Sequence, residues 1–203
     1  MDTAFLISAF VTLFVVIDPL GLLPIFAAIT HDDSAAQRRA IALRSIIIAA
    51  SVLTLFAVAG ERVLNFVGIS MAAFRIAGGM LLFLTALEML FERRTKRRED
   101  QTDEERPDPS IFPLATPLIA GPGSIASIIL LTGQTTSWAE TGLLILVMAF
   151  VLLLVLTLFL SAGLLSRLLG TTGINVTSRL LGMLLAALSV QFVLDGLAQS
   201  GLI

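Results

Sequence analysis

The chain has 203 residues, 57% of them hydrophobic, with a formal net charge of −2. Its 15 glycines raise the apolar share to roughly 64%, against about 45–50% in soluble domains. The sequence therefore predicts a membrane protein whose main partner is the lipid bilayer. With no cysteine, it excludes disulfides, thiol catalysis and cysteine–zinc sites.

Six apolar segments are each long enough to cross a hydrocarbon core of about 30 Å. They cover residues 4–30, 40–60, 70–91, 111–133, 142–166 and 179–200. The N-terminal Met1-Asp2-Thr3 lacks the basic region of a cleavable signal peptide, so we expect the first segment to be retained. The predicted fold class is an all-α polytopic membrane protein with six transmembrane helices.

The first and fourth segments carry the same proline motif. It reads Asp18-Pro19-Leu20-Gly21-Leu22-Leu23-Pro24 in the first and Thr116-Pro117-Leu118-Ile119-Ala120-Gly121-Pro122 in the fourth. Two prolines five residues apart are expected to break a helix. Broken segments at matching places in two halves are the sequence signal of a transporter binding site. We therefore predict a substrate or ion site built from both motifs.

In the first motif, Asp18 is the central candidate, with Pro19, Gly21 and Pro24 around it. It lies about 14 residues, or roughly 21 Å, from the start of its span. An ionisable group at that depth indicates function by default, here binding of a cation or of a substrate ammonium. The alternative is a helix cap that satisfies backbone N–H groups of the next half-helix.

In the second motif, Thr116 and Pro117 precede the sequence Gly121-Pro122-Gly123-Ser124, which is typical of the start of a second half-helix. The N–H groups and positive end of such a helix suit an anionic group, for example a carboxylate. The alternative is a packing kink with Ser124 as the cap. A carboxylate at one break and helix donors at the other would together suit a zwitterion.

The third and sixth segments indicate an internal duplication. Arg75, Gly78 and Thr85 recur at the same spacing as Arg179, Gly182 and Ser189. Three spans per half make the second half enter the membrane from the opposite side, which predicts two inverted three-helix repeats. Arg75 and Glu88 are candidates for gating or coupling, with interfacial anchoring as the alternative for both.

The segment between the halves is dense in both signs of charge. We place the first repeat at 1–92, a charged cytoplasmic loop at 93–110 and the second repeat at 111–203. With both termini outside, eleven of the thirteen Lys and Arg residues fall inside: Arg38, Arg39, Arg44, the six of 93–106, Arg167 and Arg179. That bias favours both termini outside the cytoplasm. Juxtamembrane basic residues more often set topology than bind nucleic acid, so no nucleic-acid partner is expected.

These strings resemble the MarC family of bacterial integral membrane proteins, over essentially the whole chain. The resemblance rests on Val16-Ile17-Asp18-Pro19-Leu20-Gly21-x-x-Pro24-Ile25-Phe26, on Phe74-Arg75-Ile76-Ala77-Gly78-Gly79 with Glu88, and on Pro113-Leu114-Ala115-Thr116-Pro117-Leu118-x-x-Gly121-Pro122-Gly123-Ser124. It implies a six-helix protein of the inner membrane in a 3+3 arrangement. The family is distantly similar to LysE-type amino-acid exporters, and some members are regarded as neutral amino-acid transporters.

The sequence thus favours a secondary transporter of small solutes, with neutral amino acids first, by alternating access at the paired breaks. An enzyme is disfavoured, because one histidine supports neither a zinc-protease pair nor a hydrolase base. An aspartyl dyad would need Asp195 beside Asp18. His31 with Asp32 and Asp33 makes a poor metal site, and no cofactor is expected. Lipid handling of the scramblase kind and a non-transporting assembly role stay open, as does a homo-oligomer.

Overall fold

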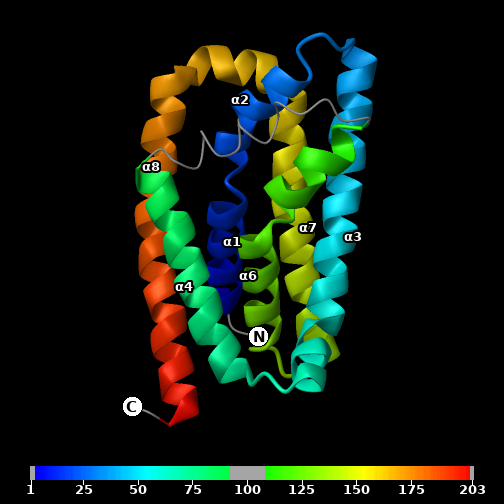
Figure 1. Ribbon diagram of the computed structural model, residues 1–203. Helices are drawn as coiled ribbons and strands as arrows, with labels where there is room; N and C mark the ends of the chain where they lie inside the picture. The colour runs from blue at the N-terminus through cyan, green and yellow to red at the C-terminus, as the bar shows by residue number, and fades with distance from the viewer. Residues whose placement is uncertain (1–2, 92–107, 202–203) are drawn as a thin grey trace.

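The computed structural model describes residues 3–91 and 108–201, and within these ranges the secondary structure is entirely helical (Figure 1). Its helices are α1 (Thr3–Ile17), α2 (Pro19–Ile29), α3 (Ala35–Val67), α4 (Met71–Leu90), η1 (Ser110–Ile119), α6 (Pro122–Thr132), α7 (Trp138–Leu160) and α8 (Ala162–Ser200). Five spans are long and apolar enough to cross a membrane, and η1 with α6 makes a sixth if that bent pair is one span. The all-α polytopic fold is confirmed.

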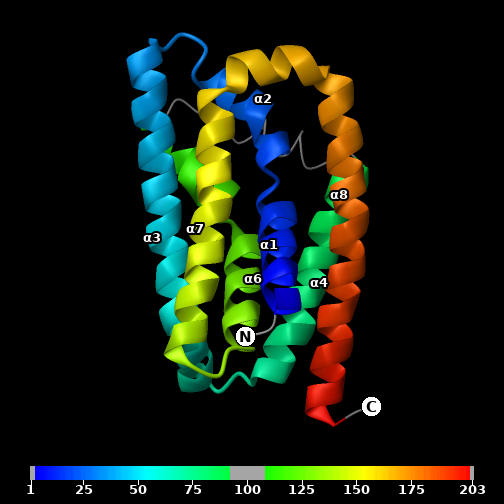
Figure 2. The ribbon, with the colours of Figure 1, turned by 180° about the vertical axis from the view of Figure 1, so that it is seen from behind.

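The two halves run through the bundle in opposite directions. The chain enters with α1 at the end that also holds the C-terminus of α8, which we call the terminal end (Figure 1). Helix α4 finishes and η1 begins at the other end, the loop end, and the view from behind gives the same arrangement (Figure 2). The fold is therefore two inverted three-helix repeats whose first and fourth spans are broken.

The outer surface of the bundle is apolar. Phe66 is 91% exposed and Leu146 65% exposed, and many Leu, Val, Ile and Phe side chains are similarly placed. Patches of this extent are rare on soluble monomers, whereas lipid tails solvate them. The interior is apolar as well: a large cluster joins α1, α2, α3, η1, α6 and α7, and a smaller one joins α1, α4, α6 and α8.

Helices α4 and α8 approach closely through small residues. A Cβ added at Gly79 would lie 2.7 Å from the carbonyl oxygen of Ser189, and one added at Gly182 would lie 3.0 Å from Cβ of Met89. Small residues let transmembrane backbones approach in this way. Gly78 instead faces α6, where its added Cβ would lie 2.9 Å from Leu130. The duplicated glycines are thus packing positions between spans.

Hydropathy alone misjudged where three spans begin and end. We predicted 40–60, but α3 runs from 35 to 67 because Ser34 and Gln37 form a capping box at its start. Gly68, in the left-handed conformation, ends it. We also predicted 142–166 and 179–200, whereas α7 ends at Leu160 and the last span covers Thr172–Ser200, after a kink at Gly170.

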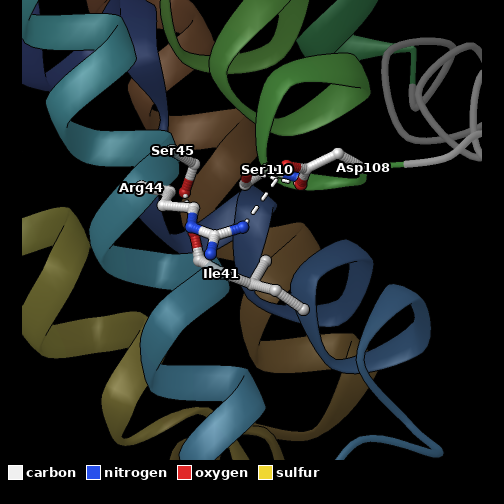
Figure 3. Close-up of polar contacts among 5 residues, drawn as sticks. All are labelled: Ile41, Arg44, Ser45, Asp108 and Ser110. Carbon is white, nitrogen blue, oxygen red and sulfur yellow. Dashed lines mark hydrogen bonds and ion pairs between the residues drawn. The ribbon is translucent and has the colours of Figure 1, made fainter.

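Most of the charged loop predicted at 93–110 lies outside the described residues, as do residues 1, 2, 202 and 203. Its last residues are described, and Asp108 fastens the start of η1 to α3 (Figure 3). Oδ1 of Asp108 accepts from the backbone N–H of Ser110 at 3.0 Å and from its hydroxyl at 2.6 Å. Oδ2 lies 3.5 Å from Nη1 of Arg44. The bonds from Ser110, with a smaller effect of Arg44, lower the pKa of Asp108.

We expect Asp108→Asn to lower thermal stability slightly at neutral pH, and the difference from wild type to vanish in acid. A carboxyl whose folded pKa is depressed stabilises the fold above its unfolded pKa of about 3.9, and this is lost as the pH falls through the folded value. The contact is half open to solvent, so the effect is about 1 kcal/mol or less. Thermal unfolding of both proteins in detergent from pH 7 to pH 3 measures it, with the exposed Asp32→Asn as control. A difference that does not change with pH would show that the charge of Asp108 contributes nothing.

Candidate functional site

The first break is a single residue, Asp18, between α1 and α2. Its backbone is left-handed (φ 56°, ψ 65°), a conformation that asparagine and aspartate tolerate better than most residues. Its N–H donates to the carbonyl of Phe14 at 2.9 Å and its carbonyl accepts from Leu22 N–H at 3.2 Å. The chain therefore leaves helical geometry for one residue only, at a position that is 2% exposed.

The carboxylate of Asp18 folds back over the first turn of α2. Oδ1 accepts the backbone N–H of Gly21 at 3.1 Å, which is the geometry of an N-cap. A Cβ added at Gly21 would clash with Oδ2 of the same carboxylate. Glycine is therefore required at position 21, because any side chain there would displace the carboxylate from its present position. The capping role that we left as the alternative is present in the structure, and it does not exclude binding.

Only the first proline of the motif coincides with the break in the first span. Pro24 lies inside α2, which continues to Ile29. Pro24 cannot donate a backbone hydrogen bond, but Leu22, Leu23 and Phe26 around it are buried in the core and hold the turn in place. Only the residue before Pro19 leaves the helix, in keeping with the restriction that proline puts on its predecessor.

The second break is longer and of a different kind. Segment η1 has wide turns, in which Ala120 N–H donates to the carbonyl of Ala115 at 2.8 Å, five residues back. Its backbone is extended at Phe112 and Thr116, each preceding a cis proline. Helix α6 then begins at Pro122, with Gly121 as its cap and a 53° bend from η1. The two copies of the motif thus give two different breaks.

The first turn of α6 has no side chain capping it. Gly121 has no side chain to offer, and no other described residue caps the N–H groups of Gly123 and Ser124. Pro122 is exposed and Gly123 half-buried, although most of α6 after them is buried. These donors at an accessible helix start have the geometry of an anion site. Ser124, in the same turn, is buried.

The two breaks meet in the middle of the bundle. A Cβ added at Gly123 would lie 3.2 Å from Cγ1 of Val16, two residues before Asp18. It would also lie 3.5 Å from Leu82 and 3.9 Å from the hydroxyl of Thr85, both on α4. Figures 1 and 2 both show the top of α6 beside the joint between α1 and α2. The structure therefore places the last turn of α1, which ends one residue before Asp18, against the first turn of α6. Thr116 and Pro117 belong to η1, which precedes that turn in the chain.

Arg75 and Glu88 lie on opposite sides of this meeting point. Arg75 is half-buried in the second turn of α4, near the terminal end, and its Cβ packs against Gly196. Its Nε is buried and has no hydrogen-bond partner in the described part of the chain. Glu88 is half-buried, one turn beyond Thr85 towards the loop end. Neither touches the breaks through a described contact, so gating remains a proposal for both.

The sequence also raised two alternative sites, an aspartyl dyad with Asp195 and a metal site at His31. Gly196 packs against Ala72 and Ile76 at the start of α4, whereas the breaks lie beside Leu82 and Thr85, about 9 Å further along that helix. Its neighbour Asp195 bonds to Gln191 at 2.7 Å, so no aspartyl dyad with Asp18 forms. His31 contacts Asp32 at 3.0 Å in an exposed turn. Among residues 3–91 and 108–201 no three metal-ligating side chains are grouped.

Sequence reasoning missed two buried hydroxyls. Thr12 and Ser127 are fully buried, and neither hydroxyl has a hydrogen-bond partner among the described residues. A buried polar group without a partner costs about 1–3 kcal/mol, so each needs a reason. The available signal was their spacing: Thr12 precedes Val16 by four residues and Ser127 follows Gly123 by four, which puts each on the face where the breaks meet.

Comparison with known proteins agrees with this architecture. The family described as MarC family integral membrane protein matches residues 3–200. An Archaeoglobus fulgidus protein described as a UPF0056 membrane protein is 37% identical over 97% of this chain and 93% of its own length. The UPF0056 inner membrane protein YhgN of Escherichia coli is 38% identical over 95% of both chains. An Aquifex aeolicus relative is 36% identical over 94% of this chain and 91% of its own. No solved structure matches.

Proposed function

The chain belongs to the MarC family of integral membrane proteins, and we propose that it is a secondary transporter of small zwitterionic solutes, with neutral amino acids as the substrate class. One observation carries the proposal: the uncapped start of α6 packs at mid-bundle against Val16, two residues before the buried carboxylate of Asp18. The carboxylate would receive an ammonium group and the N–H groups of Gly123 and Ser124 a carboxylate.

The size of the site supports a small solute. Val16, Leu82 and Thr85 surround Gly123 within 4 Å of a Cβ position, which leaves little room for a bulky side chain. The site residues of the proposal are Asp18, Pro19, Gly21, Pro24, Thr116, Pro117, Gly121, Pro122, Gly123 and Ser124, with Arg75 and Glu88 as gating or coupling groups.

Cavities with charged lining open at both ends of the bundle. At the terminal end one of about 290 Å³ lies between α3, α6 and α7, beside Glu61, Arg62 and Trp138. At the loop end one of about 510 Å³ lies between α2, α3 and α7, beside Asp33, Arg38 and Arg39. Polar openings at both ends with broken spans between them suit alternating access, in which each end opens in turn around a central site.

The orientation is also a proposal. The basic residues of α3 near the loop end, Arg38, Arg39 and Arg44, and those of the charged loop favour the cytoplasmic side for the loop end. Both termini would then lie outside the cytoplasm, in the inner membrane of the cell. The proposal gives the protein a small-molecule substrate, no nucleic-acid partner and no catalytic role.

We expect counterflow in proteoliposomes to identify the substrate. Vesicles loaded with unlabelled alanine, glycine or serine should accumulate the same labelled solute transiently, whereas vesicles loaded with a sugar should not. Amino acids lacking either charge, offered as the amide or the N-acetyl derivative, should compete poorly, because each loses one half of the site. Transbilayer movement of labelled lipid without solute flux would instead establish lipid handling. Neither activity from well-folded protein would leave an assembly role.

A further inference from the structure

The two buried hydroxyls without partners occupy matching positions on α1 and α6. These helices pack against each other and run in opposite directions (Figure 1). Val16 of α1 lies beside Gly123 of α6. One turn from that contact towards the terminal end, on the same faces, α1 presents Thr12 and α6 presents Ser127. The two hydroxyls are therefore level with each other, about 6 Å along the bundle from that contact.

Many other hydroxyls in the described helices bond to their own helix. Thr30 donates to Phe26 at 2.8 Å, Thr85 to Leu81 at 3.0 Å and Thr157 to Leu153 at 2.8 Å. Buried Ser45 does the same, donating to Ala42 at 2.9 Å. Thr12 and Ser127 are as deeply buried but do not make this bond. Both residues lie on the faces that α1 and α6 present to each other, one turn from the contact of Val16 with Gly123.

The two hydroxyls lie where α1, α4 and α6 pack together, and we call this interface the seam. On the side of the breaks it holds Thr85 and the first turn of α6. Arg75, one turn before Gly78 on α4, also has a buried Nε without a described partner, and its Cβ packs against Gly196 of α8. The seam is closed here by apolar side chains, since Val16, Leu82 and Leu130 belong to one buried cluster.

We propose that the route of the solute between the breaks and the terminal end follows this seam, and that Thr12 and Ser127 are the groups that bind it on the way. The inference rests on the transport function proposed above and adds its path. A hydroxyl both donates and accepts, so a pair of them serves either end of a zwitterion in passing. In the structure described the route is closed by the Val16–Leu82–Leu130 layer, and it opens in the other state of the transport cycle.

Cysteine accessibility tests the route directly, because the chain has no cysteine of its own. Thr12→Cys and Ser127→Cys should react with a charged, membrane-impermeant methanethiosulfonate added from the terminal side. Ile69→Cys, in the turn between α3 and α4, marks that side, and in intact cells it should label from outside. Ser51→Cys, exposed on the lipid face of α3, is the control and should not react. Saturating substrate should change the rates at 12 and 127 about threefold or more, and leave that at 69 unchanged.

Variants that lack one hydroxyl distinguish a role in solute binding from a role in packing. Thr12→Val and Ser127→Ala remove an unpartnered polar group, so thermal stability should be unchanged or higher. Solute affinity should nevertheless fall about three- to tenfold, the worth of one hydrogen bond. Ser45→Ala, where the hydroxyl is already bonded within its helix, should leave affinity unchanged.

The possible results distinguish failure of the proposed route from failure of the proposed transport function. No reaction at 12 and 127 from either side, or rates equal to that of Ser51→Cys, would overturn the route even if the protein transports. If both cysteines react from the terminal side but the protein shows no flux for any solute, the seam is accessible to water and the proposed transport function is overturned. Unchanged affinity in both hydroxyl deletions would remove Thr12 and Ser127 from the binding groups.

Discussion

Asp18→Asn is expected to fold, insert and unfold like the wild type while losing most of its solute flux, by about 10- to 100-fold. Asparagine tolerates the left-handed backbone at this position and caps a helix nearly as well as aspartate. What it lacks is the charge, and hydrogen bonds to charged groups contribute about 1.5–3 kcal/mol. Counterflow at matched protein density measures the loss, and thermal unfolding in detergent measures the fold.

Two further variants sharpen this expectation. Asp18→Ala removes the cap as well as the charge and leaves a left-handed alanine, so it should lose about 2–4 kcal/mol of stability in addition to flux. Asp195→Asn changes the aspartate that bonds to Gln191 near the terminal end and should keep flux within about twofold. Full transport by a well-expressed Asp18→Asn protein would reduce Asp18 to its capping role and confine the site to the 121–124 turn.

Gly21→Ala should reduce flux as severely as loss of Asp18, although alanine carries no chemistry. The new Cβ would clash with Asp18 Oδ2, so the carboxylate must move to another rotamer and give up its bond to the residue 21 N–H. By helix propensity alone the substitution would stabilise α2 by about 1 kcal/mol. We expect the displaced cap to cancel that gain and the displaced charge to abolish binding. Flux and thermal unfolding of the variant are the measurements.

Gly142→Ala is the matched control, because Gly142 lies within α7 and a Cβ there meets nothing within 4 Å. It should stabilise the protein by about 1 kcal/mol and leave flux unchanged. Combining Gly21→Ala with Asp18→Asn should add little to the loss caused by either alone, since both act on one carboxylate. Wild-type flux in Gly21→Ala would mean that the place of that carboxylate does not matter for transport.

The proline pairs located both breaks from the sequence, because proline disfavours helical backbone in the residue before it. Asp18 and Thr116 both follow that rule. The form of each break could not be derived in this way. Pro24 stays in α2 because buried neighbours fix its turn, whereas the bend between η1 and α6 follows the extended backbone around Thr116 and Gly121. Tertiary packing decides between those outcomes.

The ends of α3 could have been predicted from Ser34, Gln37 and Gly68, which are capping signals that a hydropathy window does not register. Thr12 and Ser127 are a different case. Each is a small hydroxyl in an apolar span, where such residues commonly bond to their own helix. Only the register of α1 against α6, set by the contact of Val16 with Gly123, places them level with each other.

The two half-helices at the centre, α2 and α6, differ in the charged side chains at their ends. Helix α2 carries an opposite charge at each pole: Asp18 at its positive end, and at its negative end Arg38, which donates to the carbonyls of Thr30 and His31 at 2.9 Å. Helix α6 has no such counter-charge at its start among the described residues. The field between the breaks therefore has a fixed polarity, negative at Asp18 and positive at Gly123. A zwitterion bound there, as we propose, would be aligned in one direction only, so its side chain would always meet the same wall of the site.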